Sequence, residues 1–143
     1  MLKQIKAVIV GYGNRGQVYA DYSLDRPEEF AVAAVVDPNG FKLEEAKKKY
    51  SLPSDKLFKS FDEFMKSGVD CDIVINATMD EIHYETAMQI LNGGYDMLIE
   101  KPIVPNKEEL FDIKRVAEEK GLKVFVCHVL RYTPFYKTIK KLI

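Results

Sequence analysis

The chain has 143 residues, a length typical of one globular domain. Its 21 basic and 22 acidic side chains give a formal net charge of −1 at pH 7, so there is no excess of positive charge to attract nucleic acid or an anionic membrane. A content of 47% hydrophobic and 30% charged residues is typical of a soluble folded protein and argues against disorder. The longest apolar run, 30–36, is too short to span a bilayer.

The N-terminal residues lead directly into a short apolar run and show no features of a signal peptide, so we expect a cytoplasmic protein. Two isolated cysteines, Cys71 and Cys127, are interpreted as buried free thiols in a reducing compartment. Together with His83 and His128 they provide no ligand set with the spacing of a zinc site. We therefore predict no metal.

Five short runs rich in β-branched and other apolar residues predict strands. They lie at 5–10, 30–36, 71–77, 97–100 and 123–127, with a marginal further strand at 56–58. Apolar residues are continuous within these runs rather than alternating with polar ones, as in strands that are buried on both faces.

Segments with helical character separate the predicted strands. One begins at the glycine-rich motif at 11–16, two cover 41–50 and 61–66, and a fourth ends at the glycines 93–94. The fifth runs from Asn106 to Lys120, with Glu109 as the partner of Asn106 in a capping box. Alternating strands and helices imply parallel pairing with right-handed crossovers. The sequence therefore predicts an α/β fold with a doubly wound parallel sheet, which binds ligands at the carboxyl ends of its strands.

The motif GYGNRG at 11–16 follows the first predicted strand and opens a helix. Asp37 ends the second predicted strand, at the spacing typical of the Rossmann dinucleotide-binding fingerprint. In this motif Gly11 permits a tight turn, Gly13 lets the backbone approach a pyrophosphate, and Gly16 lets the helix pack closely on the strand. Free N–H groups at the start of the helix attract the phosphates.

The acid at the end of the second strand bears on the choice of cofactor. Asp37 can accept hydrogen bonds from both ribose hydroxyls, and its charge repels a 2′-phosphate, which favours NAD over NADP. Lys42 is close enough in sequence to weaken that repulsion. Two residues of the motif each have two possible roles. Arg15 contacts a phosphate or stays solvated at the loop edge. Asn14 contacts the cofactor or caps the helix.

Polar and charged residues follow three further predicted strands. These segments are ATMDEIH at 77–83, EKP at 100–102 and CHVLRY at 127–132. In their order and spacing, together with GYGNRG and Asp37, they resemble the glucose–fructose oxidoreductase/inositol dehydrogenase family, written Gfo/Idh/MocA, over essentially the whole chain. Members of that family have an N-terminal dinucleotide-binding domain, followed by an α/β domain that binds substrate and forms subunit contacts.

The resemblance implies roles for five residues. Lys101 would be the active-site lysine, which orients the substrate hydroxyl near the nicotinamide, and Glu100 would lie beside the cofactor ribose. Thr78 and His83 would lie along the adenosine and ribose side, and Arg131 near the nicotinamide or substrate. For His83 a buried structural role at the start of a helix is the alternative.

By the same resemblance, residues 1–127 form the dinucleotide-binding domain, and 128–143 form a linker and the first helix of a substrate and oligomerisation domain outside this chain. We expect part of an oxidoreductase that transfers a hydride between NAD(P) and a sugar, cyclitol or related polyol. The complete protein would be a homo-oligomer, and the domain alone inactive, with no nucleic-acid or membrane partner. The alternatives are a non-catalytic NAD(H) sensor and an NAD-dependent glycoside hydrolase or dehydratase of the same family.

Overall fold

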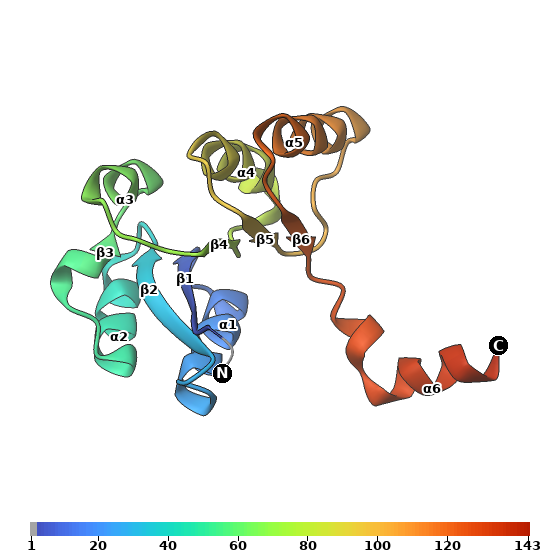
Figure 1. The fold of residues 1–143 in the computed structure, drawn as a ribbon. Coiled ribbons are helices and arrows are strands. Elements are labelled where there is room, and N and C mark those ends of the chain that lie inside the picture. Colours follow the sequence, from blue (N-terminus) through green and yellow to red (C-terminus); the bar gives the residue numbers. More distant parts are fainter. Residues whose placement is uncertain (1–2) are drawn as a thin grey trace.

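The computed structural model describes residues 3–143 and contains one six-stranded sheet in the order β3-β2-β1-β4-β5-β6 (Figure 1). The strands are β1 (Ile5–Val10), β2 (Phe30–Val36), β3 (Leu57–Phe58), β4 (Ile73–Asn76), β5 (Met97–Ile99) and β6 (Val124–Val126). Every neighbouring pair is parallel. The predicted doubly wound α/β fold is therefore confirmed.

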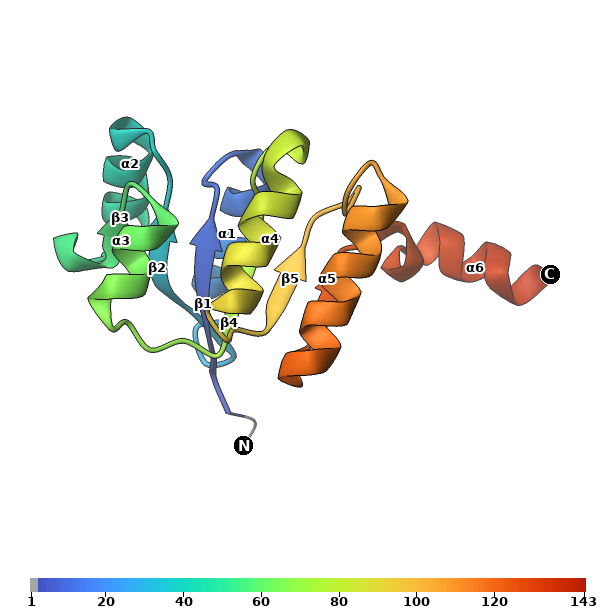
Figure 2. The same ribbon diagram turned by 90° about the horizontal axis from the view of Figure 1, so that it is seen from above.

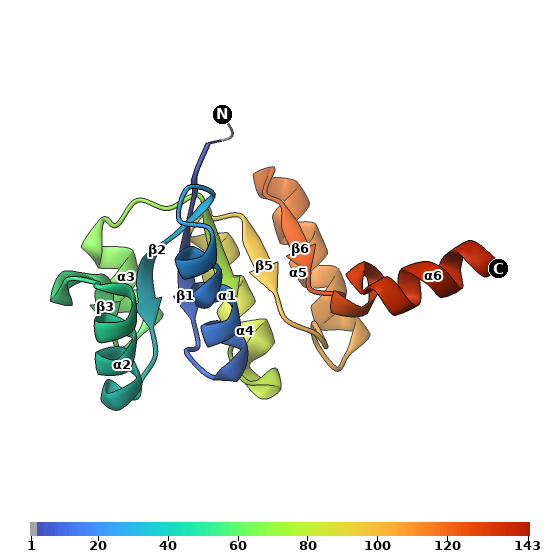
Figure 3. The ribbon, with the colours of Figure 1, turned by 90° about the horizontal axis from the view of Figure 1, so that it is seen from below.

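Helices cover both faces of this sheet. They are α1 (Asn14–Asp25), α2 (Gly40–Tyr50), α3 (Phe61–Ser67), α4 (His83–Asn92), α5 (Lys107–Lys120) and α6 (Pro134–Leu142), with short 3-10 turns η1 (Ser54–Lys56), η2 (Asp80–Ile82) and η3 (Val129–Tyr132). Helices α3, α4 and α5 lie on one face (Figure 2), whereas α1 and α2 lie on the other (Figure 3). Helix α6 extends away from the sheet (Figure 1). Within residues 3–143 no helix is long and apolar enough to cross a membrane.

Alternation along the strands divides the core into two layers. In β1, Val8 and Val10 pack with the side chains of α3, α4 and α5, whereas Ala7 and Ile9 pack with those of α1 and α2. All four are buried. A strand enclosed in this way has apolar residues at every position, which explains the continuous run in the sequence.

Three strands are shorter than their apolar runs predict, namely β4, β5 and β6. The apolar runs overestimate strand length because residues remain buried beyond the last one that pairs with a neighbouring strand. Ala77 and Glu100, for example, are buried although each follows the end of its strand. Cys71 and Cys127 are free, as predicted, but they are half-buried rather than buried. Cys71 precedes β4 and Cys127 follows β6, so neither cysteine lies within a strand.

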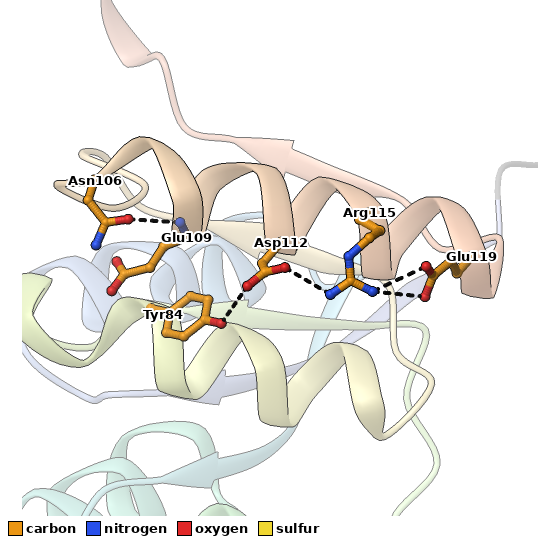
Figure 4. Close-up of polar contacts among 6 residues, drawn as sticks. All are labelled: Tyr84, Asn106, Glu109, Asp112, Arg115 and Glu119. Carbon is orange, nitrogen blue, oxygen red and sulfur yellow. Dashed lines mark hydrogen bonds and ion pairs between the residues drawn. The ribbon is translucent and has the colours of Figure 1, made fainter.

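Polar side chains join the outer surfaces of α4 and α5 (Figure 4). The Tyr84 hydroxyl donates to Asp112 (3.1 Å), which also accepts from the Arg115 guanidinium (2.8 Å). These two donors hold the pKa of the Asp112 carboxyl below its usual value. At the start of α5 the Asn106 Oδ1 accepts from the Glu109 N–H (2.8 Å), as predicted for its N-cap. Of these contacts, the Tyr84–Asp112 hydrogen bond joins α4 to α5, whereas the other two lie within α5 and its N-cap.

Candidate functional site

A cavity of about 590 Å³ opens at the carboxyl ends of β1, β2 and β4. The strand order reverses here, because the chain runs outward from β1 through β2 to β3 and then returns to β4 on the other side of β1. Doubly wound sheets bind their ligands at this reversal. The predicted site residues that line the cavity are Gly11, Gly13, Asn14, Arg15, Asp37 and Thr78.

The three glycines of the motif differ in what surrounds them. Gly11 has a φ of +87°, and a Cβ there would lie 2.6 Å from the carbonyl oxygen of Ala77. A Cβ on Gly16 would lie 2.1 Å from the Gly11 carbonyl oxygen, so only glycine lets α1 approach the turn this closely. At Gly13 no atom of the described residues, apart from its neighbours in the chain, lies within 4 Å of the Cβ position. Gly13 therefore presents open backbone to the cavity.

The first turn of α1 faces the cavity with its N–H groups. Gly13 takes the N-cap position and Asn14 is the first helical residue, so the alternative that Asn14 caps this helix is wrong. Among residues 3–143 no side chain caps these N–H groups with a hydrogen bond. Free donors together with the positive end of the helix dipole form an environment suited to a phosphate group.

The Asp37 carboxylate is fixed in the wall of the cavity. It is 5% exposed, and its two oxygens accept from the N–H groups of Tyr12 (2.8 Å) and Asn39 (2.9 Å). The Lys42 ammonium lies 3.6 Å from the Asp37 Oδ2, so the two residues form an ion pair. Each carboxylate oxygen can accept a further hydrogen bond, which leaves capacity for two hydroxyl donors.

Tyr12, inside the glycine motif, holds the turn in place through its side chain. Its side chain is fully buried, and its hydroxyl donates to that of Tyr50 (3.1 Å), which in turn donates to Asp21 (2.7 Å). Burial and the contacts with Tyr12 and Asp21 raise the pKa of Tyr50. Sequence analysis missed this anchor, because the position of Tyr12 between two glycines does not indicate the direction of its side chain.

Arg15 and Glu100 form an ion pair at the border of the cavity, with the Arg15 Nε 2.8 Å from the Glu100 Oε1. The same carboxylate accepts from the Tyr19 hydroxyl and from the Lys101 N–H (3.1 Å). Burial alone would raise the pKa of Glu100, but the hydrogen bonds from Tyr19, Arg15 and Lys101 outweigh it and hold this pKa below its usual value. The Arg15 Nε is thus paired, whereas the Arg15 side chain as a whole is 44% exposed and lines the cavity, and Glu100 faces α1.

Lys101 follows β5, outside the lining of the cavity. Its side chain is exposed and forms no ion pair among residues 3–143, whereas its backbone N–H is held by Glu100. The Lys101–Pro102 peptide bond is cis. The hydrogen bond to Glu100 therefore holds the backbone of Lys101, while its ammonium group is exposed.

His83 lies beneath the loops that carry Thr78 and Lys101. It has no exposed surface, and its ring nitrogens lie 2.8 Å from the Pro102 carbonyl oxygen (Nδ1) and 3.1 Å from that of Thr78 (Nε2). The Asn76 side chain, which sequence analysis missed, donates to the His83 carbonyl (3.1 Å). His83 thus occupies the buried structural position that was its alternative, rather than the cavity.

Arg131 does not reach the cavity. It lies in η3 and lines a separate hollow beside β6, together with Cys127 and His128. Within the described part of the chain, no three His, Cys, Asp or Glu side chains gather in a group suited to a metal ion.

The reversal of strand order, the open backbone at Gly13 and the acid at the end of β2 define a dinucleotide-binding Rossmann domain. The family model of the GFO_IDH_MocA proteins, described as "Oxidoreductase family, NAD-binding Rossmann fold", matches residues 5–128. The chain belongs to this family, and its residues 5–128 match the NAD-binding domain.

Relatives agree with this assignment. The chain is 32% identical over 139 residues to scyllo-inositol 2-dehydrogenase (NADP(+)) IolW of Bacillus subtilis, covering 97% of this chain and 37% of that protein. Among solved structures it is similar to apo scyllo-inositol dehydrogenase from Lactobacillus casei (25% identity, TM-score 0.87, 99% of this chain and 42% of that one). It also has the fold of the WlbA dehydrogenase from Bordetella pertussis, solved with NADH and UDP-GlcNAcA (20% identity, TM-score 0.88, 96% and 41%). The chain spans about two fifths of the length of these relatives.

Proposed function

We propose that the chain is the cofactor domain of a dehydrogenase that transfers a hydride between NAD and a sugar, cyclitol or related polyol. One observation carries the proposal: a single cavity at the reversal of the sheet joins the open backbone of Gly13 to the fixed carboxylate of Asp37. The substrate class is supported by relatives named as inositol dehydrogenases.

The residues of the cavity fit a dinucleotide. Free N–H groups at the start of α1 would hold the pyrophosphate, and Asp37 would accept from the hydroxyls of the adenosine ribose. Its negative charge, fixed by the Tyr12 and Asn39 N–H groups, favours NAD over NADP. When bound, the cofactor supplies a nicotinamide ring that accepts or donates the hydride.

Lys101 is the residue of this chain that we assign to the chemistry. Its backbone is held by Glu100 and its ammonium group is free, so it can orient a substrate hydroxyl and move a proton at that oxygen. Residues 1–127 would then form the cofactor domain, and residues 128–143 the connection to a domain that completes the substrate site. We place the complete protein in the cytoplasm as a homo-oligomer.

The test is an assay of the complete protein with NAD and a panel of inositols and sugars. Net formation of NADH is expected with at least one polyol, and Lys101→Ala should reduce it strongly, whereas Lys114→Ala on the exposed face of α5 should not. Binding of NAD without turnover of any polyol would contradict the dehydrogenase and favour a sensor. Turnover of a glycoside without net NADH would instead favour the hydrolase or dehydratase.

A further inference from the structure

Tyr19, in the second turn of α1, contacts the carboxylate of Glu100. Its hydroxyl donates to the Glu100 Oε1 (2.5 Å), the oxygen that also accepts from the Arg15 Nε (2.8 Å). The other oxygen, Oε2, accepts from the Lys101 N–H (3.1 Å). The two oxygens therefore have separate partners: Oε1 is bound by two side chains of α1, and Oε2 by the residue that follows Glu100.

The Glu100 carboxylate has little room to move. Its side chain is 6% exposed, and its backbone N–H donates to the Asn76 carbonyl at the end of β4 (3.1 Å). Because a buried side chain on a fixed backbone is confined by its neighbours, the groups bound to Oε1 decide where Oε2 lies. The contacts from α1 therefore set the position of the acceptor that holds the Lys101 N–H.

Arg15 and Tyr19 differ in what else they can bind. The Arg15 side chain is 44% exposed and lines the cavity, so a bound anion can draw its guanidinium away from Glu100. Tyr19 is half-buried and lies outside the lining of the cavity. Burial above all raises the pKa of Tyr19, so its hydroxyl stays protonated and remains a donor. Tyr19 therefore keeps its contact with Glu100 even where Arg15 turns to a ligand.

The segment that carries Lys101 has a second fixed point. The Pro102 carbonyl oxygen lies 2.8 Å from the Nδ1 of His83, which has no exposed surface. The backbone of Lys101 is thus held on both sides, whereas its ammonium group is exposed. The position of that ammonium group depends on how firmly these two contacts hold the backbone.

We propose that Tyr19 is a positioning residue for Lys101 and that it acts through Glu100. Loss of the Tyr19 hydroxyl leaves the Glu100 Oε1 to Arg15, which a ligand can draw away, so the Lys101 N–H is held less firmly. Lys101 then meets a substrate hydroxyl in fewer productive arrangements, and a misplacement of about 1 Å is enough to slow a reaction strongly. The inference rests on the proposed function, which assigns Lys101 to the chemistry, and deepens it by naming the residue that orients Lys101.

The first test is amide hydrogen exchange in the 143-residue chain, followed by NMR. Tyr19→Phe should raise the exchange rate of the Lys101 N–H about threefold to tenfold, because its acceptor is held less firmly. The N–H groups within α1 and β5 should keep their exchange rates, because the substitution removes no backbone hydrogen bond. A general rise in exchange over both elements would assign Tyr19 a purely structural role and overturn the inference.

The second test is turnover by the complete protein with NAD and the same panel of inositols and sugars. Tyr19→Phe should lower kcat about tenfold and change the KM for NAD less than about twofold, since Lys101 is displaced while the cavity is not. Tyr22→Phe is the matched control, because it removes a hydroxyl of the same helix that donates to Glu29. It should leave both kcat and the exchange rate of the Lys101 N–H unaltered.

Failure of the inference and failure of the proposed function give different results. If Tyr19→Phe leaves either kcat or the exchange rate of the Lys101 N–H unaltered while Lys101→Ala reduces turnover strongly, the inference is wrong and the proposed function stands. If Lys101→Ala leaves turnover unaltered, or the unaltered protein oxidises no polyol, the proposed function is contradicted, and the inference with it.

Discussion

Arg15 in the first turn of α1 and Glu100 after β5 form an ion pair of 2.8 Å across the border of the cavity. Because Glu100 also accepts from the Lys101 N–H, one buried carboxylate joins the first turn of α1 to the loop that carries Lys101. The two halves of the proposed site are therefore connected through the protein, before any ligand spans them.

Replacing Glu100 by Gln should destabilise the fold at neutral pH by about 1–3 kcal/mol, since charge-assisted bonds from Arg15 and Tyr19 are weakened around a buried group. The pKa of Glu100 is below its ordinary value in the folded state, so this stabilisation is present above about pH 4.3 and is lost as the pH falls below it. Denaturant unfolding at neutral and acid pH measures the effect.

The difference in unfolding free energy between the chain and its Glu100→Gln variant should shrink as the pH is lowered through that range. Glu119→Gln, at an exposed position of α5, provides the control and should show a much smaller difference at neutral pH. If the difference in unfolding free energy between the chain and Glu100→Gln were the same at all pH values, the charge of Glu100 would not be the source of the stabilisation.

The glycines of the motif permit a matched pair of alanine variants. Gly16→Ala should destabilise the fold by about 1–3 kcal/mol, because its Cβ would lie 2.1 Å from a backbone carbonyl oxygen. Gly13→Ala should cost less, about 0.5–1 kcal/mol, because alanine is a poorer N-cap than glycine although no described atom crowds its Cβ position, and it should weaken dinucleotide binding by placing a methyl group in the cavity. Thermal unfolding and calorimetry distinguish the two, and equal destabilisation by both variants would contradict this reading of the turn.

Local patterns in the sequence were sufficient to predict the sheet, the glycine turn and Asp37 at the cavity, because each depends on neighbouring residues and on the spacing of strand ends. The partners of Glu100 and His83 were not predictable in this way. Arg15 and Glu100 are 85 residues apart in the chain and meet only when the fold brings α1 to the segment that follows β5. The buried position of His83 likewise depends on the carbonyl groups of two separate loops, which leave no pattern in the sequence.

Lys101→Ala should leave the affinity of the 143-residue chain for NAD within about threefold, since this side chain is exposed and does not line the cavity. In the complete protein the same change should lower turnover by about 100-fold or more, as for loss of a proton-transfer group. Calorimetry on the chain checks the expected NAD affinity, and a rate assay on the complete protein checks the expected loss of turnover. Loss of NAD binding in the variant would assign Lys101 to the cofactor site instead.

Cys71 should react slowly with thiol reagents, because burial, together with the charges of Asp70 and Asp72, raises its pKa to about 11. Only a small fraction is therefore thiolate at neutral pH. Reaction with iodoacetamide followed by peptide mass spectrometry should show modification of Cys71 that accelerates steeply as the pH is raised above 9, with Cys71→Ser removing the signal. Rapid alkylation of Cys71 at neutral pH would show that its thiol is more exposed and more acidic than this structure indicates.

Calorimetric comparison of the chain with its Asp37→Ala variant, each titrated with NAD and with NADP, addresses the binding site itself. The chain should bind NAD more tightly than NADP, and Asp37→Ala should weaken NAD binding about tenfold while reducing the preference, because the ribose hydroxyls lose their acceptor and the 2′-phosphate its repulsion. Unaltered NAD affinity in Asp37→Ala, in a variant that melts like the parent chain, would contradict the placement of the cofactor in this cavity.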